Sequence, residues 1–194
     1  MLKSTGFKKI NISIFISGNG SNLKNLIDQS VQKNSKFKIA LVVSNNPKAK
    51  GLNHTKKFKI KKKIVKYSNI KNAEKKILTE LKKNKIDLVC LAGFMKILSK
   101  NFIKVFNGKI INIHPSLLPK YKGLNTHQRA IDNKEKYSGC TVHYVNSKLD
   151  SGKIILQKKV KIFKNDTSKK LNKRVLKHEH LLYSKALKKV LLSL

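Results

Sequence analysis

Residues 9–31 read KINISIFISGNGSNLKNLIDQSV, and this stretch decides the fold. Isoleucine occupies every second position of its first half, which predicts a strand over Lys9–Ser17. The glycine-rich turn that follows ends at Ser21, which we expect to cap a helix over Asn22–Val31. A strand, a tight turn and a helix in this order are typical of the start of a parallel α/β sheet.

The same alternation of strand and helix continues along the chain. The predicted strands are Phe37–Ser44, Lys63–Tyr67, Ile86–Ala92 and Lys109–Ile113, and the predicted helices between them are Ala49–Phe58 and Asn72–Lys83. The run Ile86–Ala92 is apolar throughout, as expected of a strand that is covered on both faces. This order predicts an α/β fold that is Rossmann-like, with a mostly parallel sheet flanked by crossover helices.

The last third of the chain changes its pattern. Gly139–Val145 and Lys153–Ile162 predict two neighbouring strands that form an antiparallel pair near the C-terminal end. Leu171–Leu192 repeats leucine and valine at helical spacing and should close the fold. Because no repeat or low-complexity linker interrupts the pattern, we expect a single domain over residues 1–194.

The composition excludes some locations and leaves one alternative function open. No apolar stretch is long enough to span a membrane, and the opening residues lack a signal-peptide cleavage site, so we expect a cytoplasmic protein. The net charge of +36 would suit a nucleic-acid-binding module. However, lysine supplies 43 of the 45 basic residues and only Arg129 and Arg174 are arginine. The lysines are also dispersed, so we interpret the excess as a compositional preference with no specific nucleic-acid partner.

The segment GNGSN at 18–22 is a candidate anion site, because free backbone N–H groups collect at the start of the predicted helix. It matches neither the GxGxxG pattern nor the Walker lysine pattern, which argues against a dinucleotide or a triphosphate. A plain turn with a helix cap is the alternative interpretation.

Asn112 and His114 lie at the carboxyl end of a predicted parallel strand, where open α/β sheets bind ligands. Because they are two positions apart, both side chains should point to the same side. Asp150, one of only nine acidic residues, is a candidate partner that would raise the proton affinity of His114. Alternatively, His114 only bonds a carbonyl at the strand end, and Asp150 only stabilises a turn.

The remaining candidates are weaker. His178, Glu179 and His180 are adjacent on a predicted helix and point in different directions, and the HExxH spacing is absent, so we expect no metal site. The histidines without a spacing argument, interpreted as surface or packing residues, are His54, His127 and His143. Two cysteines, Cys90 and Cys140, are too few for a disulfide framework or a zinc cluster.

Four segments, in one order and over nearly the whole chain, resemble the phosphoribosylglycinamide formyltransferase family. They are ISGNGSNL at 16–23, LAGFMKIL at 91–98, INIHPSLLPKYKGLNTH at 111–127 and LDSGKII at 149–155. Broader folate formyltransferases share the Asn–x–His and the downstream Asp, whereas GNGSN and HPSLLP select this member. The resemblance implies transfer of a formyl group from 10-formyltetrahydrofolate to the amine of 5-phosphoribosylglycinamide in purine biosynthesis.

The resemblance also implies roles for individual residues. Asn112, His114 and Asp150 would be catalytic. Gly20, Ser21 and Asn22 would bind the substrate phosphate, and Glu179 the ribonucleotide. The folate would contact Lys71, Met95, Lys96, Ile97, Leu98, Asn112, Asn146, Ser147, Lys148, Leu149 and Asp150. The sequence differs from the family pattern at Lys122, where proline is common, and at Asn125, where histidine is common.

These residue types suit the implied reaction. Attack of an amine on a formyl group builds negative charge on the formyl oxygen, to which Asn112 can donate a hydrogen bond. We expect His114, kept protonated by Asp150, to donate to the same oxygen and to help move a proton to the folate nitrogen. Hydrolysis of the formyl folate, with water in place of the amine, is the alternative reaction. The expected partners are the two small-molecule substrates, with no metal, no membrane and a monomeric or homodimeric chain.

Overall fold

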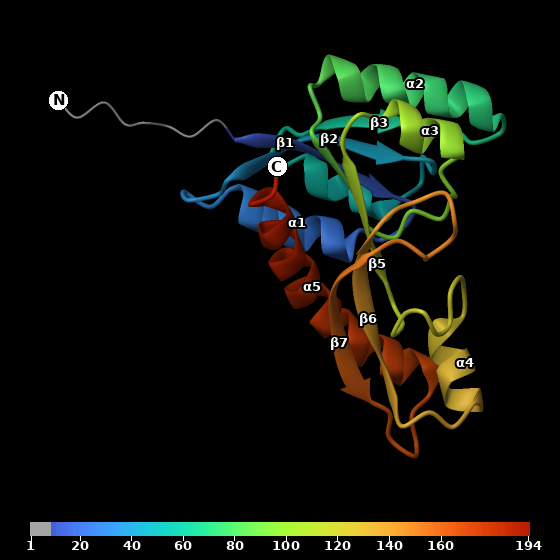
Figure 1. Cartoon of the computed structure of the whole chain (residues 1–194). Helices are drawn as coiled ribbons and strands as arrows, with labels where there is room; N and C mark the ends of the chain where they lie inside the picture. Colours follow the sequence, from blue (N-terminus) through green and yellow to red (C-terminus); the bar gives the residue numbers. More distant parts are fainter. Residues whose placement is uncertain (1–8) are drawn as a thin grey trace.

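The computed structural model describes residues 9–194, which form a seven-stranded sheet with helices on both faces (Figure 1). The strands are β1 (Ile10–Ile16), β2 (Phe37–Ser44), β3 (Lys61–Ile64), β4 (Leu88–Leu91), β5 (Lys109–His114), β6 (Tyr137–Tyr144) and β7 (Ile154–Lys161). The helices are α1 (Ser21–Ser30), α2 (Ile70–Lys83), α3 (Lys100–Val105), α4 (Thr126–Asp132) and α5 (Ser168–Leu191), with a 3-10 helix, η1, at Lys50–Thr55. The first eight residues lie outside the described part of the chain. The expectation about a signal peptide rests partly on these residues.

The strand order is β3-β2-β1-β4-β5-β6-β7. The strands from β3 to β5 pair in parallel, whereas β5 with β6 and β6 with β7 pair antiparallel. The predicted Rossmann-like sheet with an antiparallel pair near its C-terminal end is therefore confirmed.

The alternation in β1 distributes its side chains between two cores. Ile12, Ile14 and Ile16 are fully buried in the core that also contains residues of α1 and α5. Phe15 faces the other way, into a core shared with Ile77 of α2 and Phe102 of α3. Full burial of a side chain of this size contributes about 1.5–3 kcal/mol. Figure 1 shows the result, with α1 and α5 on one face of the sheet and α2 and α3 on the other.

Several local predictions were wrong in detail. Ser21 does not cap α1; the N-cap is Gly20, in the left-handed conformation with φ 69°, and no side chain caps the helix. The region predicted as a helix over Ala49–Phe58 contains the shorter 3-10 helix η1. The short strand predicted at Lys63–Tyr67 is β3, which lies two to three residues earlier.

One row of paired residues crosses the sheet where the functional side chains lie. Leu91 of β4 pairs with Asn112 of β5, Asn112 pairs with His143 of β6, and His143 pairs with Ile154 of β7. Directly paired residues present their side chains on the same face of a sheet. The register therefore places the Asn112 amide beside the His143 ring.

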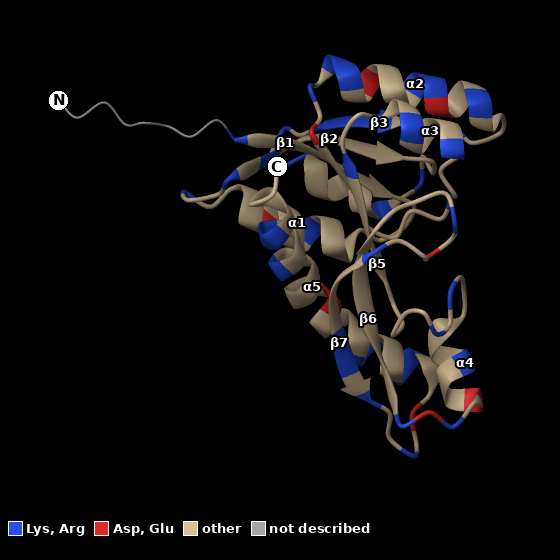
Figure 2. Cartoon of the chain, viewed as in Figure 1, with Lys and Arg blue, Asp and Glu red and all other residues tan. Residues whose placement is uncertain are grey.

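The positive charge is not concentrated on one element. Figure 2 shows lysine and arginine on α1, α2, α4, α5 and β7. Within residues 9–194, no helix combines the length and the apolar character needed to cross a bilayer.

Candidate active site

Four side chains from β5, β6 and the β6–β7 loop form a buried polar cluster. His114 Nδ1 lies 3.3 Å from Asp150 Oδ2, and His143 Nε2 lies 3.6 Å from Asp150 Oδ1. Asn112 Nδ2 donates to His143 Nε2 at 3.2 Å. The structure therefore brings the predicted Asn112, His114 and Asp150 together, with His143 as the link between the first and the last.

His143 was missed by the sequence interpretation, which treated it as a surface or packing residue. Its Nδ1–H donates to the Tyr144 carbonyl at 2.8 Å, so Nε2 is free to accept from Asn112. One N–H of the Asn112 amide is thereby engaged and oriented, and its second N–H can donate elsewhere. The signal that could have identified His143 is the register of the predicted antiparallel strands, which sequence alone does not give.

His114 is hydrogen-bonded at one ring nitrogen and faces a carboxylate at the other. Nε2–H donates to the Tyr121 carbonyl at 2.9 Å, and Nδ1 faces Asp150. Burial lowers the pKa of His114, and this effect outweighs the raising effects of the Tyr121 carbonyl and the Asp150 carboxylate. Burial therefore opposes the expected effect of Asp150, which is to keep His114 protonated.

The pKa of Asp150 is also lowered, which for a carboxyl group favours the charged form. Burial alone would raise its pKa, but the neighbouring His143 ring and the hydrogen bond from the Gly123 amide hold the pKa of this carboxyl below its usual range. Gly123 N donates to Asp150 Oδ2 at 2.9 Å. Because Nε2–H donates to the Tyr121 carbonyl, Nδ1 of a neutral His114 ring presents its lone pair to the Asp150 carboxylate. This pair can accept one proton between its two atoms.

The two positions that differ from the family pattern lie in the loop between β5 and α4. Lys122 Nζ donates to Ser151 Oγ at 2.6 Å, which ties this loop to the β6–β7 loop. Asn125 is the N-cap of α4 and has φ 55°, a conformation that asparagine adopts more readily than most residues. In Figure 1 this loop and the β6–β7 loop lie on the same side of the molecule.

A second polar group forms at the start of α1. Asn22 Nδ2 donates to Glu179 Oε2 of α5 at 2.9 Å, and both side chains are buried. Burial raises the pKa of Glu179, and the hydrogen bond from Asn22 opposes this shift. Gly20 is packed so closely against Gly51 that an added Cβ would lie 2.7 Å from the Gly51 Cα. The uncapped helix start after Gly20 can bind an anion through its backbone N–H groups.

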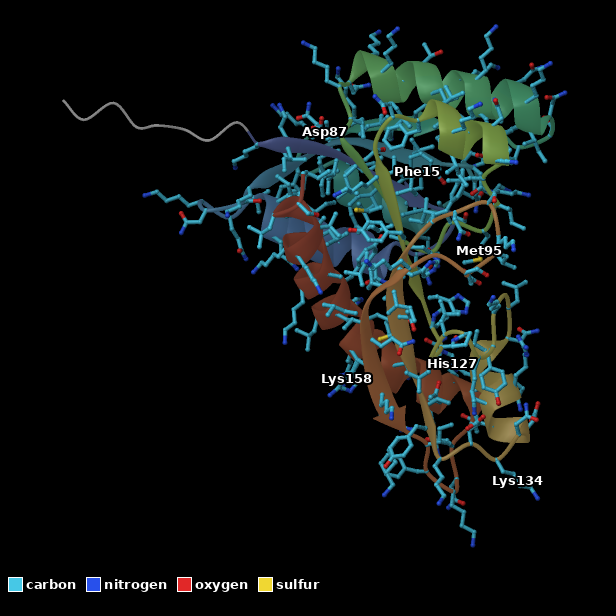
Figure 3. The ribbon with its side chains drawn as sticks, in the orientation of Figure 1. Phe15, Asp87, Met95, His127, Lys134 and Lys158 are labelled. Carbon is cyan, nitrogen blue, oxygen red and sulfur yellow. The ribbon has the colours of Figure 1, made fainter. Side chains whose placement is uncertain are left out.

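The segments expected to bind folate are two loops with exposed apolar side chains. Met95 and Ile97 are 61% and 65% exposed, and Leu149 is 49% exposed, whereas Leu98 is buried. The first loop is fixed at one end by Met95 N, which donates to Ser17 Oγ at 2.7 Å, and at the other by Ser99 N, which donates to Glu74 at 2.7 Å. Figure 3 shows Met95 and His127 on the side of the molecule where the β6–β7 loop lies.

Lys71 lies on the first turn of α2 and lines a groove of about 1110 Å³ between α2 and α3. Asn112, His114 and Asp150 do not line this groove. Within residues 9–194, no group of three or more His, Cys, Asp and Glu side chains could hold a metal ion.

The formyl transferase family matches residues 10–187, so the chain with this α/β sheet and polar cluster is an enzyme of the formyl transferase class. Phosphoribosylglycinamide formyltransferase from Haemophilus influenzae is 42% identical over 180 residues, which cover 91% of this chain and 85% of that protein. The enzyme of the same name from Brucella melitensis has a solved structure that is 42% identical, with a TM-score of 0.89, and the match covers 95% of this chain and 96% of that one.

The chain belongs to the phosphoribosylglycinamide formyltransferase family. It is also 41% identical over 186 residues to the human trifunctional purine biosynthetic protein adenosine-3, of which it spans only 18% of the length.

Proposed function

We propose that the chain transfers a formyl group from 10-formyltetrahydrofolate to the amine of 5-phosphoribosylglycinamide, as a single formyltransferase domain of purine biosynthesis. The observation that carries the proposal is the convergence of Asn112, His114 and Asp150, from separate segments, on one buried cluster. The names of the relatives support the same reaction. Its partners would be these two substrates in the cytoplasm, with no specific nucleic acid, and the chain would be a monomer or homodimer.

The substrates fit the two polar regions separately. The uncapped start of α1 at Gly20, Ser21 and Asn22 would bind the phosphate of the ribonucleotide, and Glu179 would accept from its sugar. The formyl folate would lie along Met95–Leu98 and Asn146–Asp150, whose exposed apolar side chains suit its aromatic rings. The proposed folate residues within these loops include Lys96, Ser147 and Lys148, with Lys71 as a further basic contact.

The chemistry follows from the protonation states of the cluster. When the amine attacks the formyl carbon, a C–N bond forms and the carbonyl electron pair moves to the formyl oxygen. The second N–H of Asn112 would donate to that oxygen and stabilise its charge. The His114–Asp150 pair would accept the proton that the attacking nitrogen releases. It would return this proton to the folate nitrogen as the bond from that nitrogen to the formyl carbon breaks.

The test is an absorbance assay of the purified protein with a folate formyl donor, with and without the ribonucleotide. We expect loss of the formyl folate only when the ribonucleotide is present, with one formylated ribonucleotide formed per donor consumed. Release of formate without the ribonucleotide would instead identify a hydrolase. DNA binding that resists physiological salt would favour the nucleic-acid-binding alternative.

A further inference from the structure

The chain retains arginine at only two positions, Arg129 and Arg174, against 43 lysines. If lysine is used wherever the fold tolerates it, these two positions are ones at which lysine cannot make the contacts that arginine makes. The structure agrees, because each guanidinium lies over an aromatic ring and also donates to the backbone. Arg174 lies 4.6 Å from the centre of the Phe163 ring and donates to the Lys161 carbonyl at 3.0 Å.

Arg129 makes the corresponding contacts next to the active site. It lies 5.2 Å from the centre of the Tyr121 ring. Its Nη1 donates to the Lys122 carbonyl at 2.7 Å and approaches the Leu124 carbonyl at 3.4 Å. A planar guanidinium can stack on a ring and donate in its own plane at the same time, which the compact ammonium of lysine cannot do.

The segment that Arg129 holds contacts both members of the proton-accepting pair. The Tyr121 carbonyl accepts from His114 Nε2, and the Gly123 amide donates to Asp150 Oδ2. The backbone here is unusual at Tyr121, a bulky residue whose φ is 55°. Residues in this conformation persist only where their surroundings hold them.

We propose that Arg129 is a positioning residue that holds Tyr121–Leu124 in the conformation which fixes the proton on His114 Nε2 and directs Asp150 at Nδ1. The proposal rests on the proposed function for its kinetic consequences. Its structural consequence is that the Gly123 amide hydrogen is protected from exchange with solvent. This consequence does not depend on that function.

A test has to separate the effect of the positive charge of Arg129 from the effect of its contacts with the loop. The groups that face His114 are Asp150 of the β6–β7 loop, His143 of β6, and His127 and Arg129 of α4. The positive charge of Arg129 contributes to the lowered pKa of His114, after larger effects of burial. Arg129→Lys keeps the charge and removes the stacked donor, so it isolates the geometry.

The experiment compares Arg129→Lys and Arg129→Ala with Arg174→Lys, a control outside the cluster that also loses a ring contact and a backbone donor while it keeps a positive charge beside Asp166. We expect both Arg129 variants to lower kcat by about 10- to 100-fold, with the KM for the ribonucleotide within about two-fold of wild type. Arg174→Lys should keep kcat within about two-fold. Amide exchange measured by NMR should become faster at Gly123 in Arg129→Lys and stay unchanged there in Arg174→Lys.

Wild-type kcat and wild-type exchange at Gly123 in Arg129→Lys would overturn the proposal. If Arg129→Ala does not fold, kcat and the exchange rate at Gly123 in Arg129→Lys decide whether the proposal holds. If the wild-type protein transfers no formyl group, the proposed function fails, and the exchange at Gly123 alone decides the role of Arg129.

Discussion

The side chains of Asn22 and Glu179 are joined by a buried hydrogen bond of 2.9 Å although 157 positions separate them. The bond connects the uncapped start of α1 to the middle of α5, so the two ends of the fold jointly form the proposed ribonucleotide site.

Glu179→Ala should impair both binding and stability, because it leaves the buried Asn22 amide without its acceptor. We expect the Kd for the ribonucleotide to rise by about 10-fold or more, and the free energy of unfolding to fall by about 1–3 kcal/mol. Calorimetric titration and thermal unfolding measure the two effects. Glu179→Gln keeps an acceptor oxygen and should recover most of the stability; equal losses in both variants would contradict this account.

His114→Ala and Asp150→Asn should each lower turnover by about two or more orders of magnitude, because each removes one half of the proton-accepting pair. Binding of the ribonucleotide should survive, since its proposed contacts lie at the start of α1. Steady-state kinetics and titration with the ribonucleotide check both statements. Near-normal turnover in the two variants would remove these residues from the mechanism.

Gly20→Ala should destabilise the protein, because φ at Gly20 is 69° and the new Cβ would lie 2.7 Å from the Gly51 Cα. A left-handed alanine costs about 1–2 kcal/mol before any clash, so we expect the melting temperature to fall by about 2–8 °C. Gly18→Ala is the control for stability, because an added Cβ there has no atom of the described residues within 4 Å. Similar melting temperatures for the two variants would refute the steric argument.

Stability should decrease as the pH falls from about 8 to about 5. Burial lowers the pKa of both His114 and His127 from the ordinary value of 6.5, so the unfolded chain takes up protons that the folded state resists. This contribution is complete above the unfolded pKa and is lost as the pH falls through the folded pKa. Thermal unfolding across this range should show a shallower slope for His127→Gln than for wild type, whereas equal slopes would exclude a contribution from His127.

Much of the fold could be predicted from sequence because its strands and long helices carry strong periodic patterns. The alternating isoleucines of β1 and the helical spacing in α2 and α5 correspond to faces that the structure buries. In contrast, α3 and α4 have six and seven residues, too few to be stable alone. Their stability depends on buried tertiary contacts such as that of Phe102, which the local sequence does not reveal.

The residues of the candidate site that lie in recognisable motifs could be predicted from the sequence. The features that depend on strand register and on burial could not. Asn112, His114 and Asp150 were predicted from their motifs, and the structure places them in one cluster. His143 enters the cluster only through its pairing with Asn112 across two antiparallel strands. The lowered pKa of His114 depends on burial, which opposes the effect of its carboxylate partner and exceeds it.

The row that runs from Leu91 through Asn112 to His143 divides the proposed catalytic residues into two groups with different backbone support. Asn112 and His143 are carried by adjacent strands, so the hydrogen bonds of the ladder hold their backbone in place. Asp150, by contrast, belongs to a connection between strands and is anchored mainly through side-chain and loop contacts. We therefore expect any backbone rearrangement to fall on the loop that carries Asp150, while the strand that carries Asn112 keeps its position.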